Sequence, residues 1–343
     1  MKFPLLFKCA AISVLLTISV SHGFSLPQTS PGEKEAQAAS KSALLVLNKI
    51  ENTLAIVDPT SLKVVGRVPT GTGPHEVVAS ADGRLAYVAN YGDQQTLGNS
   101  LSIIDIAARK EIKRVELGPL FRPHGLVEAG GKIYFTVEVN RAIARYDPAS
   151  ARVDWVMGTG QTATHMLAIM PDGKRAYTAN IASDTVTAIE LNAPPGPKQI
   201  TQIGVGKQPE AIDISPDGRE LWVGQNGDGS ISIIDTATNK VKETIKVGEV
   251  PIRVKFTPDG KRVLVSDPQA GELIVLDAAT RKEIKRLAIE GVPVGILIAP
   301  GGSRAFIAAT QANKVIVVDL EKLALAETIE PGQGPDGMAW AGM

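Results

Sequence analysis

The sequence predicts an all-β fold, a β-propeller of seven blades with four antiparallel strands in each blade. Two observations lead to this prediction. A pattern of about 43 residues recurs seven times between Ser42 and the C-terminus. Within each copy the apolar residues are often β-branched and alternate with a period of two, as in strands. Four-stranded repeats of this length are typical of propellers.

The clearest copy of the repeat spans Leu221 to Arg262 and contains the strand patterns "LWVG", "SISIID", "VKETIKV" and "RVKFT". A "PDG" turn follows the last of them, with glycine supplying the positive φ that a tight turn requires. The aspartate that ends each "ID" strand is predicted to cap a turn. These residues are Asp58, Asp105, Asp147, Asp235, Asp277 and Asp319.

The two ends of the repeat region predict how the ring closes. The region begins on "ALLVLN", a second strand, and ends on "DGMAWAGM", a first strand with no blade after it. We therefore expect the C-terminal strand to complete the first blade and to leave no open sheet edge.

The N-terminal residues predict export. Residues 1–23 combine Lys2 and Lys8 with the apolar run "CAAISVLLTISV", which is typical of a signal peptide and too short to span a membrane. Residues 24–42 are polar and predict a flexible arm, so the propeller is expected over 43–343. Cys9 is the only cysteine, so the mature chain has no disulfide. We expect a periplasmic or secreted protein.

The charge balance bears on the partners. The chain has 36 basic and 36 acidic residues, and it lacks the basic field that nucleic-acid binding requires. We expect a monomer with a small-molecule ligand, no nucleic-acid partner and no membrane span.

The repeat resembles a known family. The phrases "AYVAN", "AYTAN" and "LWVGQN", followed by "IDTATNK" and "SPDG", resemble the YVTN-type β-propeller repeat family over nearly all of residues 43–343. The scaffold is also similar to propeller lactonases and to streptogramin-lyase-type enzymes. The resemblance implies the fold. It leaves the function open, because such families also include surface-layer proteins and binding modules.

Every histidine outside the leader occupies the same slot of the repeat, near the start of a first strand. Because first strands line a propeller channel, this slot places one residue per blade at the channel mouth. Read around the ring, the residues are His75, His124, His165, Glu210, Ile252, Val294 and Asp336. The sequence therefore predicts a polar arc from Asp336 through the histidines to Glu210.

Two kinds of chemistry fit this arc. His75, His124 and His165, with Glu210 and Asp336, form a plausible ligand set for zinc, copper, iron or manganese. Alternatively, His75, His124, His165 and Glu210 are catalytic and act as general acids and bases, with carboxylates orienting the rings.

A second set of polar residues is predicted to bind substrate around the arc. It includes residues of the next slot, residues at the ends of second strands, a loop tyrosine and an arginine suited to an anion. The set is Glu76, Asn90, Tyr91, Arg122, Glu138, Asn180, Arg253 and Asp267.

The leading functional hypothesis is a metal-dependent small-molecule lyase or hydrolase. Clustering of the polar slots on adjacent blades favours an enzyme. Two alternatives use the same residues: a non-catalytic propeller that binds a ligand or a protein, and a metal-binding protein without turnover.

Overall fold

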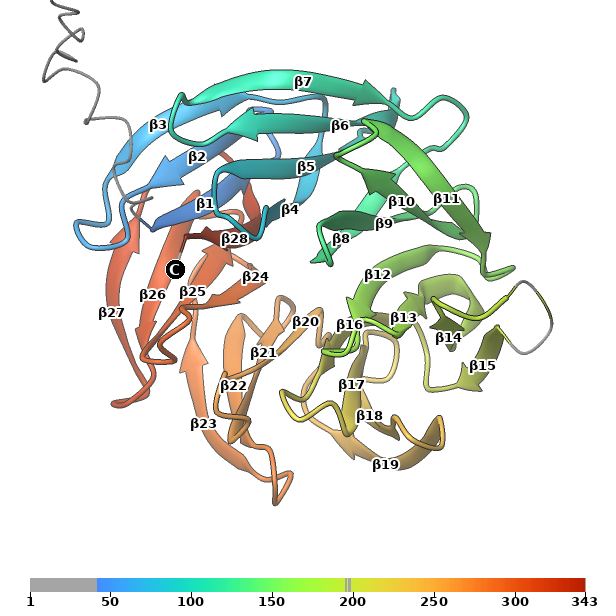
Figure 1. Cartoon of the computed structure of the whole chain (residues 1–343). Helices are drawn as coiled ribbons and strands as arrows, with labels where there is room; N and C mark the ends of the chain where they lie inside the picture. Colours follow the sequence, from blue (N-terminus) through green and yellow to red (C-terminus); the bar gives the residue numbers. More distant parts are fainter. Residues whose placement is uncertain (1–41, 195, 197–198, 343) are drawn as a thin grey trace, which may run out of the picture. The chain divides into compact units, whose positions relative to one another are not determined.

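The computed structural model describes residues 42–194, 196 and 199–342, which form one compact unit. The predicted signal peptide, and the predicted arm except for Ser42, lie outside the described residues. Seven four-stranded antiparallel sheets follow one another around a ring (Figure 1). The predicted seven-bladed β-propeller is therefore confirmed. Among the described residues, no helix is long and apolar enough to cross a membrane.

Each blade runs from an inner strand at the channel to an outer strand at the rim (Figure 1). The inner strands are β4 (Pro74–Ala79), β8 (Pro123–Ala129), β12 (Thr164–Ile169), β16 (Pro209–Ile214), β20 (Arg253–Phe256), β24 (Pro293–Ile298) and β28 (Pro335–Ala341). The second strands are β1 (Ala43–Asn48), β5 (Leu85–Gly92), β9 (Lys132–Val137), β13 (Arg175–Asn180), β17 (Glu220–Gln225), β21 (Arg262–Asp267) and β25 (Arg304–Ala309).

The third strands are β2 (Thr53–Val57), β6 (Leu97–Asp105), β10 (Ala142–Asp147), β14 (Thr185–Glu190), β18 (Ser230–Asp235), β22 (Glu272–Asp277) and β26 (Lys314–Asp319). The outer strands are β3 (Val64–Pro69), β7 (Lys110–Glu116), β11 (Arg152–Gly158), β15 (Ile200–Gly204), β19 (Lys240–Lys246), β23 (Glu283–Ala288) and β27 (Ala324–Ile329). A single-turn 3₁₀ helix, η2, spans Ile181–Ser183.

Burial follows the position of a strand within its blade. All six residues of β1 are buried, whereas nearly every residue of β19 is exposed. The core lies between neighbouring blades, where their apolar faces pack together. Trp222 of β17, for example, packs edge to face on Phe256 of β20, with 5.4 Å between ring centroids. Sandwiching between blades explains why the second strands are apolar on both faces.

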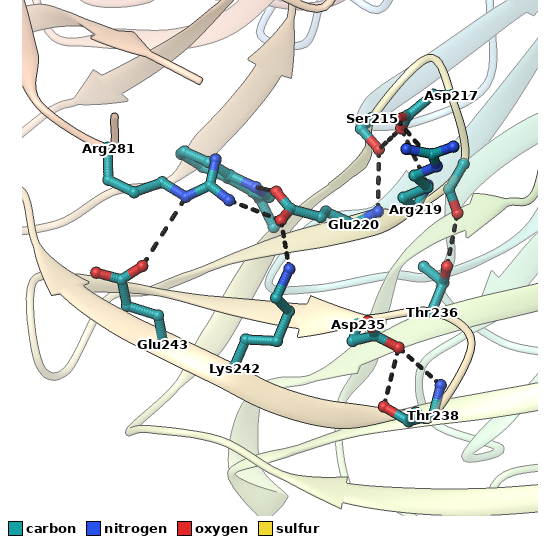
Figure 2. A network of polar contacts seen from close by, with 12 residues as sticks. Ser215, Asp217, Arg219, Glu220, Asp235, Thr236, Thr238, Lys242, Glu243 and Arg281 are labelled. Carbon is teal, nitrogen blue, oxygen red and sulfur yellow. Dashed lines mark hydrogen bonds and ion pairs between the residues drawn. The ribbon is translucent and has the colours of Figure 1, made fainter. Parts of the chain in front are cut away.

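The predicted turn chemistry is present, as Figure 2 shows for one blade. In the "PDG" turn, Asp217 accepts a hydrogen bond of 3.1 Å from the amide of Arg219, and Gly218 has a φ of 72°. Asp235 accepts a hydrogen bond of 2.8 Å from the amide of Thr238, so this aspartate caps a turn as expected.

Figure 2 also shows an ionic contact between two blades. Glu220 of β17 accepts hydrogen bonds from Lys242 of its own blade at 2.9 Å and from Arg281 of the next blade at 2.6 Å. The Arg281 guanidinium lies over the ring of Trp222, 5.1 Å from its centroid. The contact adds a polar link outside the apolar core between these blades.

The ring closes as the sequence predicts. The first blade has the strand order β28-β1-β2-β3, and the antiparallel register pairs Leu45 with Ala339 and Leu44 with Trp340. The last strand of the chain therefore supplies the inner strand of the first blade, which removes two edges that would otherwise be exposed.

Removing residues 335–343 should prevent cooperative folding, because β1 loses its partner and the first blade loses its channel strand. We expect the truncated protein to melt non-cooperatively or to aggregate well below the melting temperature of the parent. Circular dichroism and light scattering during heating would measure this. As a control, Leu325→Ala on the exposed face of β27 should change stability by no more than about 0.5 kcal/mol. A truncated protein with the parent's cooperative melting curve would show that closure is dispensable.

Candidate functional site

The three histidines share one local geometry at the start of their inner strands. Each is the second residue of β4, β8 or β12, and these strands are neighbours around the channel. The pairing register with the second strand shifts at each position, as in a β-bulge. Because a bulge turns a side chain out of the regular alternation, the repeat presents this slot toward the channel mouth.

Glycine next to the slot lets the inner strands approach one another closely. A Cβ atom on Gly337, which follows Asp336, would lie 2.1 Å from the backbone oxygen of His75. A Cβ atom on Gly125, which follows His124, would lie 2.8 Å from the backbone oxygen of His165. Both distances are too short for any side chain. The crowding of the inner strands therefore brings the slots of adjacent blades together.

The imidazole rings gather as the sequence predicts. The rings of His75 and His124 are 5.4 Å apart between centroids, and those of His124 and His165 are stacked at 3.7 Å with 29° between planes. His124 thus lies between the other two. We call these three residues the histidine cluster.

His165 is held in its protonated form by two carboxylates. Its Nδ1 lies 3.3 Å from Oε2 of Glu138, and its Nε2 lies 3.5 Å from Oε1 of Glu210. Burial alone would lower the pKa of His165, but hydrogen bonds and charge from Glu138 and Glu210 outweigh it and raise that pKa to about 9. The pKa values of both carboxyl groups fall below their usual range, despite burial, through the same contacts with His165.

His75 and His124 are held neutral. Burial lowers the pKa of His75 and lowers that of His124 further, and the charge of His165 contributes to both shifts. The Nδ1 atom of His75 lies 2.8 Å from the carbonyl oxygen of Gly73. A carbonyl oxygen can only accept, so Nδ1 carries the proton of the neutral ring and Nε2 has a free electron pair.

Within the predicted arc, two buried side-chain atoms have no hydrogen-bond partner among the described residues. They are Nδ1 of His124 and Oδ1 of Asp336, each in a residue that is only 3% exposed. The other carboxylate oxygen of Asp336 accepts a hydrogen bond of 3.0 Å from Lys49. An unsatisfied buried polar group costs about 1–3 kcal/mol, so two of them at one channel mouth indicate a place for a ligand or ordered water.

The end of β5 reaches the cluster through Tyr91, which the sequence had placed in a loop. Its hydroxyl donates a hydrogen bond of 2.5 Å to Oε2 of Glu138 and accepts one of 2.9 Å from Arg122. Its ring centroid is 4.7 Å from that of His75. Burial, and then the contact with Glu138, raise the pKa of Tyr91 to about 12, so the hydroxyl keeps its proton and remains a donor.

Glu76 and Arg253, both predicted substrate-binding residues, pair with each other. The pair joins β4 to β20 across the channel, and both side chains are largely buried. Burial raises the pKa of the Glu76 carboxyl group, although the charge of Arg253 opposes this. Both residues also line a cavity of about 480 Å³ deeper in the channel, whose walls include Leu126 and Trp340.

Three predicted substrate-binding residues instead hold the loops of their own blades. Asn90, Asn180 and Asp267 are at most 1% exposed. Asn90 donates to the hydroxyls of Ser100 and Ser102, and Asp267 accepts from backbone amides, including one at 2.6 Å. Their buried side chains hold the loops around the channel mouth and are not exposed to a ligand there.

Two residues of the site were missed in the sequence. Lys49 pairs with Asp336, and Asn226 donates a hydrogen bond of 2.6 Å to Glu210. Both occupy the slot of Tyr91 and Glu138, one residue beyond the partner of the proline slot. The repeat therefore contained the signal, because four of its copies use this slot at the mouth.

Several of the predicted metal ligands are engaged in other contacts. Both ring nitrogens of His165 face carboxylates, Glu210 is one of these, and Asp336 bonds Lys49. Within residues 42–194, 196 and 199–342, no group of three or more His, Cys, Asp or Glu side chains is arranged to hold a metal ion. Metal binding stays a prediction.

Fold and site together define a seven-bladed propeller with a titratable cluster at one mouth of its channel. The chain matches the family model described as YNCE-like beta-propeller over residues 5–341, so it belongs to that family. The match supports the propeller assignment and does not specifically confirm the YVTN-type repeat. No curated protein matches the chain.

Two solved structures illustrate the likeness in fold. A chain of Kuenenia stuttgartiensis hydrazine synthase is 19% identical, with a TM-score of 0.68 over 78% of this chain and 89% of that one. A functionally unknown protein from Desulfotomaculum acetoxidans DSM 771 is 14% identical, with a TM-score of 0.72 over 85% of this chain and 98% of that one. At these identities the likeness shows the fold alone.

The raised pKa of His165 predicts a pH dependence of stability. Its contribution is fully present below pH 6.5, the ordinary histidine value, and is lost as pH rises through about 9. Between these pH values the unfolding free energy of the parent should fall by at most about 3 kcal/mol. That of His165→Gln should not show this fall, because glutamine does not titrate. Denaturant unfolding at several pH values would measure the difference.

Nuclear magnetic resonance titration of the imidazole rings provides the direct control. His165 should titrate near 9, and His75 and His124 below 6.5. Three unperturbed histidines would contradict the ionisation pattern described above.

Proposed function

We propose that this protein is a small-molecule enzyme of lyase or hydrolase type that uses acid–base chemistry at the channel mouth. The observation behind the proposal is the split in protonation within the histidine cluster. Two adjoining rings are held neutral, while the third, stacked on one of them, is held as a cation. Environments that drive the pKa values of neighbouring groups apart are typical of acid–base sites.

His75 is the proposed general base. Its hydrogen bond to Gly73 fixes the tautomer in which Nε2 accepts a proton. His75 is only partly buried and lines an open pocket, so a substrate can reach it. Once His75 has taken up a proton, the negative charge of Asp336 stabilises the imidazolium, since that charge raises the pKa of His75. In a lyase the proton would come from carbon, and in a hydrolase from water.

His124 and His165 are proposed to support this base. The positive charge of His165 lowers the pKa values of His75 and His124, which keeps both unprotonated at neutral pH. Glu138 and Glu210 fix the ring of His165, and Tyr91 and Asn226 fix the two carboxylates in turn. His124 offers its unpartnered Nδ1 to a bound substrate or water.

We also propose export to the periplasm or beyond the cell, on the strength of the apolar N-terminal run in residues 1–23. An exported enzyme would act on small molecules outside the cytoplasm.

Replacing the base tests the proposal. His75→Gln should lower turnover by about 10²- to 10⁴-fold and leave the melting temperature close to that of the parent, because the side chain is only partly buried. Panels of lactones, aryl esters and substrates for β-elimination would identify the reaction. Asp319→Asn, a turn variant, should lower stability but leave turnover per folded molecule unchanged. A parent that binds ligands but turns over none of the panel would favour a non-catalytic binding propeller.

Chelation tests the predicted metal dependence separately. Because His165 is held as a cation and no three ligating side chains among the described residues are arranged around a metal position, we expect turnover to survive exhaustive chelation. Elemental analysis of the purified parent and of His124→Ala, before and after chelation, would measure metal content. A stoichiometric metal in the parent that is lost in His124→Ala, together with loss of turnover on chelation, would instead establish a metal enzyme.

A further inference from the structure

A pocket of about 570 Å³ opens beside the histidine cluster, between the first two blades and the loop after β5. Its walls include His75 and Tyr91, together with the cationic side chains of Lys49 and Arg122. Pockets of this size suit a small organic ligand. The acid–base chemistry proposed above does not use the two cations, so their presence needs a separate explanation.

Arg122 is held in a fixed position without a carboxylate partner. Its Nη1 donates a hydrogen bond of 2.9 Å to the hydroxyl of Tyr91, and its Nη2 lies 3.4 Å from the carbonyl oxygen of Asp93. The guanidinium also lies over the ring of Tyr91, 4.7 Å from its centroid. Within the described part of the chain it forms no ion pair with a carboxylate. A guanidinium has five N–H donors in a planar fork, so donors remain for a ligand.

Lys49, directly after β1, supplies a second cation to the pocket lining. Its ammonium group donates a hydrogen bond of 3.0 Å to Asp336 and has two further N–H donors. Asp93 is the only carboxylate that lines the pocket among the described residues, and its Oδ1 accepts the backbone amides of Gln95 and Thr96 at 2.8 and 2.7 Å. The lining therefore carries two cations against one carboxylate that a turn already uses.

We propose that this pocket binds the anionic group, a carboxylate or a phosphate, of a small polar substrate through Arg122 and Lys49. The neighbouring atoms of that substrate would then face Nε2 of His75. The inference rests on the proposed function for the fate of the ligand, but anion binding itself does not depend on turnover. A fixed guanidinium lowers the entropy lost on binding, which favours recognition of an anion over general attraction.

Calorimetric titration of the purified protein with sodium phosphate and, separately, sodium pyruvate at constant ionic strength tests the proposal. We expect one of these probes, or both, to bind with a Kd of about 1 mM, as is reasonable for so small a ligand. Arg122→Gln and Lys49→Gln should each weaken binding by about tenfold, which corresponds to the loss of one charge-assisted contact. Arg122→Lys should fall between the parent and Arg122→Gln, because it keeps the charge but loses the planar fork.

Arg84→Gln is the matched control. It removes the same charge from an exposed turn between β4 and β5, outside the pocket, and should bind both probes like the parent. Melting curves identify any variant that does not fold, and Lys49→Gln then replaces Arg122→Gln as the deciding variant. A parent that binds neither probe, or folded Arg122→Gln and Lys49→Gln proteins that bind as the parent does, would overturn the proposal.

The His75→Gln variant separates this proposal from the proposed function. It should lose turnover and keep anion binding, because the imidazole is not one of the two cations. Anion binding that requires Arg122, in a protein with no turnover, would leave the pocket proposal intact and remove the enzyme. Turnover that requires His75 but not Arg122, with no anion binding, would do the reverse.

Discussion

The pairing of β28 with β1 is the interaction on which the rest of this structure depends. It converts a row of blades into a ring, and the ring gives the channel two defined mouths. It also places Asp336 beside His75, although 261 positions separate them along the chain (336 − 75). The close approach at Gly337 shows how tightly this last strand fits. The histidine cluster is therefore a property of the closed ring and not of any single blade.

Charge at the mouth is distributed in pairs, and the pairs determine the protonation states. His165 is charged because two carboxylates from neighbouring blades surround it, and His75 and His124 stay neutral partly because His165 is charged. Arg253 pairs with Glu76, and Lys49 pairs with Asp336. Arg122 is bound only by a hydroxyl and a backbone carbonyl, which makes it the cation best able to accept a new partner.

The sequence was sufficient to predict the fold and the gathering of the histidines, because a repeat maps equivalent positions onto equivalent places around the ring. His75, His124 and His165 could be grouped without any knowledge of their contacts. Their ionisation could not be predicted, since Glu138, just after β9, and Glu210 of β16 reach His165 from the blades on either side. The sequence also placed Glu138 one position out of register. Pro74 pairs with Asn90, but Pro123 pairs with Val137, so Glu138 shares the slot of Tyr91 and faces His165, while Asn90 is enclosed by serine hydroxyls.

The ion pair between Glu76 and Arg253 has a consequence for how the molecule forms. It joins residues 177 positions apart, on strands from opposite sides of the channel. Hairpins within a blade close short loops and form early, whereas a contact of this separation must wait until the intervening blades are in place. During synthesis, a chain with only its first blades complete would carry Glu76 in water, where it is not constrained. The ion pair across the channel forms only when the later blades dock. The charges that line the channel therefore reach their final arrangement at the end of folding.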